Sequence, residues 1–238
     1  MAAASLQALY DAPGHRTSTG CAPTGRTDPY SERVNEDKAR TDRIVWIDCE
    51  MTGLSLSQDA LIEVAVLVTD FELNQLGEGI DILIAPPPAA LEQMNDFVRD
   101  MHTRSGLLEE LAGGVSMEEA QRQVMAYVRE FAPGEGKWPL GGNTVSTDRG
   151  FLARDMPELD AYLHYRIIDV SSIKELSRRW YPRVYFSAPA KNGGHRALAD
   201  IRESIAELRY YREAVFVPQP GPDSDTAKAI AARFTVRK

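Results

Sequence analysis

The sequence predicts an α/β fold in which a mixed β-sheet is flanked by helices, and three patterns lead to that prediction. Residues 44–47 are apolar, mostly β-branched or aromatic, and lead into two carboxylates, which is typical of a strand buried in a sheet. Two more apolar runs follow after short polar turns, at residues 61–69 and 80–84. Within residues 89–131, apolar side chains recur at spacings of three and four, which favours helices. Three consecutive strands with short connections predict an antiparallel start to the sheet.

The composition fits one globular domain with a tail at each end. The chain has 238 residues, of which 43 % are hydrophobic, and this is enough for a sizeable core. Residues 1–40 are rich in Gly, Pro, Ser, Thr and charge without a sustained period, so we expect a disordered N-terminal extension. The folded domain is predicted to span residues 41–217. Residues 218–238 are predicted to form a C-terminal tail with a short helix from Thr226.

Cysteine content, apolar runs and net charge limit which cellular compartment and which binding partners are expected. Two cysteines, Cys21 and Cys49, are too few for a disulfide framework, and Cys49 lies inside the predicted first strand, which favours a reducing cytoplasm. No basic segment precedes a long apolar run and no apolar run approaches 18 residues, so we expect neither a secretory signal nor a membrane span. The net charge of −8 argues against a broad binding surface for long nucleic acid.

The middle of the chain alternates helices and strands. Ser116 followed by Glu119 predicts the start of a helix, whose apolar stripe belongs to the core. A fourth strand is expected over residues 138–145, with Asp148 immediately after it where the next helix begins. Ligands usually bind at the strand ends of mixed sheets, so Asp148 is a candidate site residue.

The last third of the chain adds a strand and two helices. A fifth strand is expected over residues 165–170, and Ser172 with Glu175 is expected to cap the helix after it. The final helix follows a glycine pair and His195, a turn that lets the histidine swing over a site. Asp200 is expected about one and a half turns inside that helix.

Four acids form a candidate cation site. Asp48 and Glu50 are two residues apart on a strand, so they share a face and lie roughly 7 Å apart. Carboxylates placed so closely repel each other unless a cation lies between them, and hard oxygen ligands suit Mg²⁺ or Mn²⁺. An isolated Asp-x-Glu is more often a solvated strand edge, but Asp148 and Asp200 extend the set. Glu63 is either a further ligand or, as the favoured interpretation, a glutamate satisfied by a neighbouring backbone group.

Five ordered motifs extend this pattern, at residues 46–54, 102–107, 142–148, 164–171 and 195–204. On these motifs the chain resembles the DEDDh 3′→5′ exonucleases, and within them the oligoribonucleases, over residues 43–214. So many ordered matches are highly specific, unlike a lone Asp-x-Glu. The resemblance implies an RNase H-like fold with a mixed five-stranded sheet flanked by helices, and it implies a homodimer.

The resemblance also implies a mechanism. Asp48, Glu50, Asp148 and Asp200 would hold two divalent cations, Mg²⁺ or Mn²⁺, about 3.5–4 Å apart. One ion and His195, acting as a general base, would activate water for in-line attack on the scissile phosphate. The other ion would stabilise the departing 3′-oxygen.

The residues that contact the substrate in the family are matched less closely in this chain. Leu54 matches a leucine that wedges between the two bases of the substrate. Phe97 occupies a position where relatives commonly carry tryptophan; it can still stack on a base, more weakly because its face is smaller. Thr144 stands where a serine is more usual, and we expect its hydroxyl to keep the contact.

The remaining matches concern the 5′-phosphate and the dimer. Arg166 and Ser171 match residues that cap the 5′-phosphate, with His102 nearby, and Tyr165 would reach the neighbouring subunit's site. We therefore expect a 3′→5′ exoribonuclease that hydrolyses very short oligoribonucleotides, especially 5′-phosphorylated dinucleotides, to nucleoside 5′-monophosphates.

Two rival functions stay open at the level of the sequence. The first is a different DEDDh exonuclease acting on longer RNA or DNA 3′ ends. Such an enzyme would need a basic groove for the longer strand, and the acidic composition of this chain does not indicate one. The second is an inactive RNA-binding or dimerisation module. The complete set of four acids with His195 argues against it, because a binding protein gains nothing from carboxylates beside phosphates.

Overall fold

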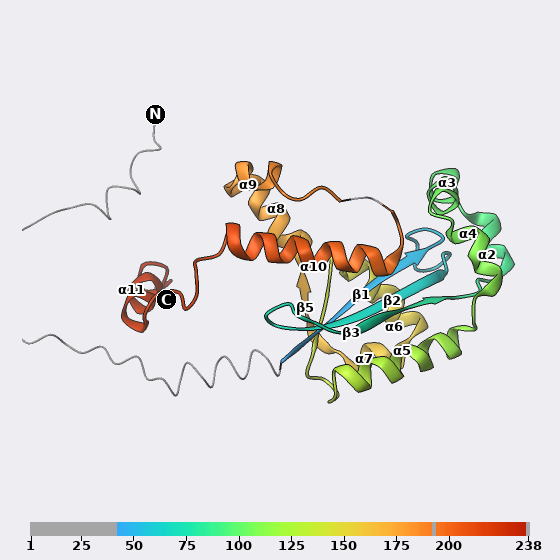
Figure 1. Ribbon diagram of the computed structural model, residues 1–238, viewed down its shortest axis with the longest axis horizontal. Coiled ribbons are helices and arrows are strands. Elements are labelled where there is room, and N and C mark those ends of the chain that lie inside the picture. The colour runs from blue at the N-terminus through green and yellow to red at the C-terminus, as the bar shows by residue number, and fades with distance from the viewer. Residues whose placement is uncertain (1–41, 192–193, 237–238) are drawn as a thin grey trace, which may run out of the picture. The chain divides into compact units, whose positions relative to one another are not determined.

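A five-stranded mixed sheet forms the centre of the part described by the computed structural model, residues 42–191 and 194–236 (Figure 1). The predicted disordered extension, Cys21 and Gly193 lie outside these residues. The sheet order is β3-β2-β1-β4-β5. The strands are β1 (Arg43–Met51), β2 (Leu61–Asp70), β3 (Gln75–Leu83), β4 (Pro139–Gly142) and β5 (His164–Asp169). β1, β2 and β3 pair antiparallel, whereas β4 pairs parallel with both β1 and β5, which confirms the predicted antiparallel start and mixed sheet.

The central strand β1 contributes to a hydrophobic core on each side of the sheet. Its side chains alternate, so Val45 and Ile47 enter one core while Ile44 and Trp46 enter the other. This double burial explains the continuous apolar run before the first carboxylate. The Trp46 indole N–H is satisfied at 2.9 Å by the hydroxyl of Thr69 on β2.

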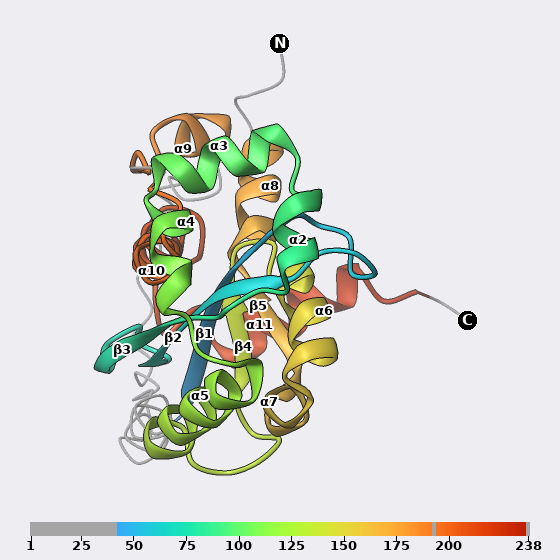
Figure 2. The same cartoon turned by 90° about the vertical axis from the view of Figure 1, so that its right-hand side faces the viewer.

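Helices cover both faces and one end of the sheet. One face carries α8 (Val170–Trp180), α9 (Pro182–Phe186) and α10 (Ala197–Ala214), and the opposite face carries α5 (Met117–Phe131), α6 (Ser146–Asp155) and α7 (Pro157–Tyr162) (Figure 1). Near the end of β1 lie α2 (Pro88–Gln93), α3 (Asp96–Arg104) and α4 (Leu107–Glu110) (Figure 2). The 3₁₀ helix η2 (Leu111–Gly113) follows α4 in the chain. The tail forms α11 (Ser224–Arg233), which confirms a short helix there. No helix in the described part of the chain combines the length and apolarity needed to cross a membrane.

The strand predicted over residues 138–145 is shorter in the structure. β4 ends at Gly142, Thr144 has a left-handed φ of 54°, and α6 already begins at Ser146. Asp148 therefore lies in the first turn of α6. Gly141 allows β4 to approach β1 closely, because a Cβ atom at this position would lie 2.7 Å from Cγ2 of Ile44.

Two predicted helix starts also differ. α8 is capped by Asp169, whose side chain accepts a 2.8 Å hydrogen bond from the Ser171 N–H, and Ser172 is already inside the helix. α10 begins at Ala197, so Asp200 lies in its first turn and not one and a half turns inside. The predicted cap of α5 is confirmed, since Ser116 accepts from the Glu119 N–H.

Candidate active site

The first two acids of the site come from the end of β1. Glu50 is 8 % exposed, and Asp48, two residues earlier, is half-buried on the same face. Burial raises the pKa of Asp48 well above its ordinary value, and repulsion from Asp148 and Glu50 raises it further. Burial, followed by repulsion from Glu63 and Asp200, raises the pKa of Glu50 to about 8. Both carboxylates are therefore held where negative charge is unfavourable.

Asp148 reaches the same place from the first turn of α6. Its Oδ1 atom accepts a 3.0 Å hydrogen bond from the N–H of Cys49, which lies between the two acids of β1. Burial raises the pKa of Asp148 to about 6, and its backbone hydrogen bonds hold it below that of Glu50. The side chain is thus fixed to β1 by the strand's own backbone.

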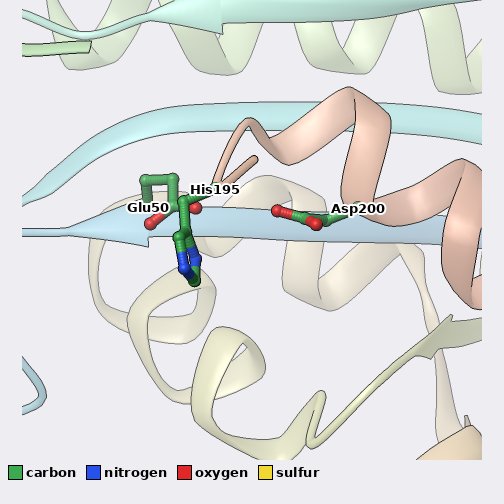
Figure 3. A group of neighbouring side chains, drawn as sticks. All are labelled: Glu50, His195 and Asp200. Atoms are coloured by element: carbon green, nitrogen blue, oxygen red, sulfur yellow. The ribbon is translucent and has the colours of Figure 1, made fainter. Parts of the chain in front are cut away.

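Asp200 and His195 approach from the opposite side. Asp200 points from α10 toward Glu50 on β1, with the His195 ring beside them (Figure 3). Single ligand atoms of Glu50, His195 and Asp200 all lie within 4.8 Å of one another. Burial, followed by repulsion from Glu203, raises the pKa of Asp200. His195 has a left-handed φ of 47°, so its position depends on the segment around it.

The four acids, here called the carboxylate cluster (Asp48, Glu50, Asp148 and Asp200), fit divalent cations. Burial raises the pKa of all four carboxyl groups, and repulsion from neighbouring acids raises these pKa values further. Four carboxylate groups offer the hard oxygen ligands that Mg²⁺ and Mn²⁺ prefer. The geometry therefore brings together the four predicted acids and the predicted histidine.

Phe97 lies close to this site, and Leu54 stands at a loop tip. Phe97 is 74 % exposed on α3 and lines a hollow of about 330 Å³ together with His195, Met101 and Arg104. Leu54 is 76 % exposed directly after β1. Large apolar side chains left so open are available for contact with a flat apolar partner such as a nucleobase.

Thr144 and Ser171 form a hydroxyl pair at the ends of β4 and β5. Their hydroxyl oxygens are 3.1 Å apart, and Oδ1 of Asp169 accepts from the backbone N–H of both residues. They line a second hollow, of about 530 Å³, with Asp169. Both backbone N–H groups are satisfied by Asp169, so a ligand in this hollow would meet the two hydroxyl groups.

His102 lies inside the protein, next to Glu50. It is completely buried; its Nε2 lies 2.9 Å from the carbonyl oxygen of Met51, so Nε2 carries the proton. Its Nδ1 lies 3.9 Å from Oε2 of Glu50 and has no hydrogen-bond partner among the described residues. Burial lowers the pKa of His102, which favours the neutral ring. The side chain lies behind Glu50 and has no exposed surface here, so its predicted contact with the 5′-phosphate stays a prediction.

Tyr165 and Arg166 lie on the exposed surface of β5. Tyr165 is 74 % exposed, its ring stacks at 4.3 Å on that of His164, and the Arg166 guanidinium lies 5.5 Å from the Tyr165 ring centre. Within the described residues, no recorded contact joins either side chain to the carboxylate cluster. Their predicted roles toward the phosphate and the partner subunit therefore stay predictions.

A buried polar network behind the hydroxyl pair was not predicted. The Asn143 amide donates to Ser204 at 2.7 Å and to Glu207 at 3.2 Å, and its oxygen accepts from the Ser171 hydroxyl. Burial raises the pKa of Glu207, but Lys191 at 2.9 Å and Lys174 at 3.2 Å outweigh it and lower the pKa. Asn143 lies inside a motif that the sequence did single out, whereas the lysine partners of Glu207 carry no sequence signal.

Known proteins are similar in sequence to this chain along most of its length. The family model described as Exonuclease matches residues 45–208. An oligoribonuclease from Streptomyces griseus is 74 % identical over 194 residues, which cover 82 % of this chain and 96 % of that protein. The chain belongs to the oligoribonuclease family. A second oligoribonuclease, from Leifsonia xyli, is 62 % identical over 192 residues, covering 81 % of this chain and 93 % of that protein.

Solved structures with lower sequence identity confirm the fold. An exonuclease I from Methylocaldum szegediense superposes with a TM-score of 0.52 at 20 % identity, covering 76 % of this chain and 41 % of that one. E. coli exonuclease I in complex with single-stranded DNA gives a TM-score of 0.54 at 16 % identity, covering 73 % and 41 %. The fold is the RNase H-like exonuclease fold. As an oligoribonuclease the chain is a 3′→5′ exoribonuclease, a phosphodiester hydrolase, and its carboxylate cluster indicates divalent-metal use.

Proposed function

We propose that this oligoribonuclease acts on very short RNA, with 5′-phosphorylated dinucleotides as its best substrates, and releases nucleoside 5′-monophosphates. The observation that carries the proposal is the convergence of the carboxylate cluster with His195 and the open aromatic face of Phe97. The net charge of −8 supports short substrates, because long RNA needs many basic contacts.

His195 would act as the general base. Histidine side chains titrate near neutral pH, so a neutral imidazole can take the proton of a water that attacks the scissile phosphorus. The bond from phosphorus to the 3′-oxygen breaks, and that oxygen leaves with a proton as the 3′-hydroxyl of the shortened RNA. Two divalent cations, Mg²⁺ or Mn²⁺, would be held by the carboxylate cluster. Their positive charge would favour loss of a proton from the attacking water and would stabilise the negative charge of the reacting phosphate.

The substrate would be held at its bases and at its 5′ end. Leu54 would wedge between the two bases and Phe97 would stack on one of them. Thr144, Ser171 and Arg166 would bind the 5′-phosphate, and the hydroxyl pair of the first two supports this. Tyr165 would contribute to the neighbouring subunit's site, which requires a homodimer.

One assay separates this proposal from its rivals. A 5′-labelled RNA dinucleotide and a 24-mer, each also as DNA, are incubated with Mn²⁺ and the products resolved over time. We expect rapid cleavage of the RNA dinucleotide, slow cleavage of the 24-mer and a large loss of kcat in His195→Ala. A preference for the 24-mer would mean a nuclease of longer strands. No cleavage of any strand would mean a binding module.

A further inference from the structure

Glu63 is a fully buried charged residue directly beside the active site. It lies on β2, and the strand register places it opposite Glu50 of β1. Neighbouring residues in an antiparallel pair point to the same face, so Glu63 borders the carboxylate cluster without belonging to the group that includes Glu50, His195 and Asp200. A buried carboxylate needs partners that offset the loss of water.

Two partners of Glu63 belong to the segment that follows His195. Arg196 Nε donates to Glu63 Oε1 at 3.1 Å, and the backbone N–H of Ala197 donates to Glu63 Oε2 at 3.2 Å. Ala197 is the first residue of α10, and the residue before that helix provides no side-chain cap. Glu63 thus binds an otherwise unpaired N–H at the positive end of α10, from a strand 134 residues away.

Arg196 also binds a second glutamate. Its Nη2 lies 2.9 Å from Oε2 of Glu110 on α4, and Nη1 donates to Oε1 at 3.2 Å. A guanidinium has its N–H donors within one rigid plane, pointing outward along different edges, so it can hold two carboxylates in fixed directions. Arg196 therefore connects β2, α4 and the start of α10.

His195 is the residue immediately before this connection. Its left-handed φ of 47° is unfavourable for a side chain with a Cβ atom and persists only where the surroundings impose it. We infer that Glu63, Arg196 and Glu110 form a clamp that positions the His195 ring over the carboxylate cluster, an inference that rests on the proposed role of His195 as general base. The three are positioning residues, since they act through His195.

The test measures whether the clamp acts through His195. Single-turnover cleavage of the RNA dinucleotide with Mn²⁺ is measured for Glu63→Gln, Arg196→Gln and Glu110→Gln, each alone and combined with His195→Ala. The matched control is Glu109→Gln, which removes a charge from the next residue of α4, an exposed side chain with no recorded pairing among the described residues. Because burial and Asp81 raise the pKa of Glu63 to about 7, the assays are run at pH 8 to keep the clamp charged.

Glu63→Gln and Arg196→Gln are expected to lower the chemical rate by about 10–100-fold, as the loss of groups supporting an active-site side chain usually does. Glu110→Gln, on the exposed side, is expected to lower it less than about 10-fold, and Glu109→Gln to leave it unchanged. Mn²⁺ affinity by calorimetry and RNA affinity are expected to stay within about threefold. In the His195→Ala background, the same substitutions are expected to have no further effect.

Each alternative outcome is decisive. Full losses that persist in the His195→Ala background, or losses explained by weaker Mn²⁺ binding, would show that Glu63 acts on the metal site instead and would overturn the clamp. Normal rates in all three clamp variants beside an impaired His195→Ala would also overturn it. If Glu63→Gln does not fold, Arg196→Gln decides by the same comparison. If His195→Ala itself is unimpaired, the failure lies in the proposed function, because His195 is then not the general base.

Discussion

At the scale of single residues, ionisation of Glu50 lowers the stability of the folded, metal-free protein. Its folded-state pKa of about 8 lies above the ordinary value of 4.5 because the side chain is buried and repelled by neighbouring acids. Between these two pH values the folded protein binds more protons than the unfolded chain. Raising the pH through that window therefore destabilises the metal-free protein. Cation binding would reverse this effect, since it favours the ionised form.

Glu50→Gln is accordingly expected to stabilise the metal-free protein while abolishing cleavage. At pH 8 in EDTA, its Tm should rise by about 3 °C or more, which corresponds to about 1 kcal/mol in a domain of this size. The rise should shrink toward pH 5, where Glu50 is protonated in the folded state, and Mn²⁺ should no longer raise the Tm as it does in the unmodified protein. Thermal unfolding across pH 5–8 with and without Mn²⁺ measures all three effects. A lower Tm for the variant at pH 8 would show that Glu50 is not held at unfavourable charge.

The sequence predicts some residues of the site and not others, for a physical reason. Asp48 and Glu50 follow from the two-residue period of a strand, and motif order adds Asp148, His195 and Asp200. The partners of Glu63 could be expected only as an unnamed backbone group, because pairing of β2 with the start of α10 depends on tertiary packing. The burial of His102 is equally invisible in sequence, since the same motif residue could face the substrate or lie behind Glu50.

At the scale of elements, one carboxylate binds the loop that carries Leu54 at two points. Asp59 accepts from the Ser55 N–H at 2.8 Å and from the Thr52 hydroxyl at 3.1 Å. Gly53 passes so close that a Cβ atom there would lie 2.5 Å from Asp59 Oδ2. Asp59 therefore fixes the path of the loop between β1 and β2, with Leu54 exposed within it.

Asp59→Ala is expected to weaken substrate binding and spare the chemistry. The RNA dinucleotide Kd should rise about tenfold, the scale of one lost base-stacking contact, and Leu54→Ala should match it. The chemical rate at saturating enzyme should change less than about threefold. Gln58→Ala is the control, because its exposed side chain has no recorded hydrogen bond among the described residues. Equal Kd values for Asp59→Ala and the unmodified protein would separate the loop from substrate binding.

The ends of helices and strands were predicted less well than the elements themselves. The three antiparallel strands were predictable as elements, but β3 begins at Gln75 and includes Gly77 and Gly79, whereas its apolar run predicted only residues 80–84. The strand over residues 138–145 was predicted too long because the left-handed Thr144 and the early start of α6 leave no sequence pattern. α8 starts earlier than predicted because Asp169, counted as a strand residue, caps it.

At the scale of the whole molecule, charge predicts the salt dependence of binding. For single strands, log Kobs falls with log salt by about 0.7 per neutralised phosphate, and a 5′-phosphorylated dinucleotide has two phosphates. The slope for dinucleotide binding to His195→Ala should therefore be no steeper than about −2. The unmodified protein should show kcat/KM falling as 5′-phosphorylated RNAs lengthen from two to ten residues. Rates that climb with length, together with a steep slope, would mean an open groove.

The hydrogen bond from the Cys49 N–H to Asp148 has a consequence for how the protein opens. β1 pairs with β4 through Val45 and Trp46, so the amide of Cys49, farther along β1, is protected by a side chain of α6 and not by that ladder. Its exchange with deuterium should therefore follow the undocking of α6, whereas exchange at the neighbouring amides of β1 should follow separation of the sheet. A single backbone amide at the centre of the site can thus report, in solution, whether Asp148 is in place.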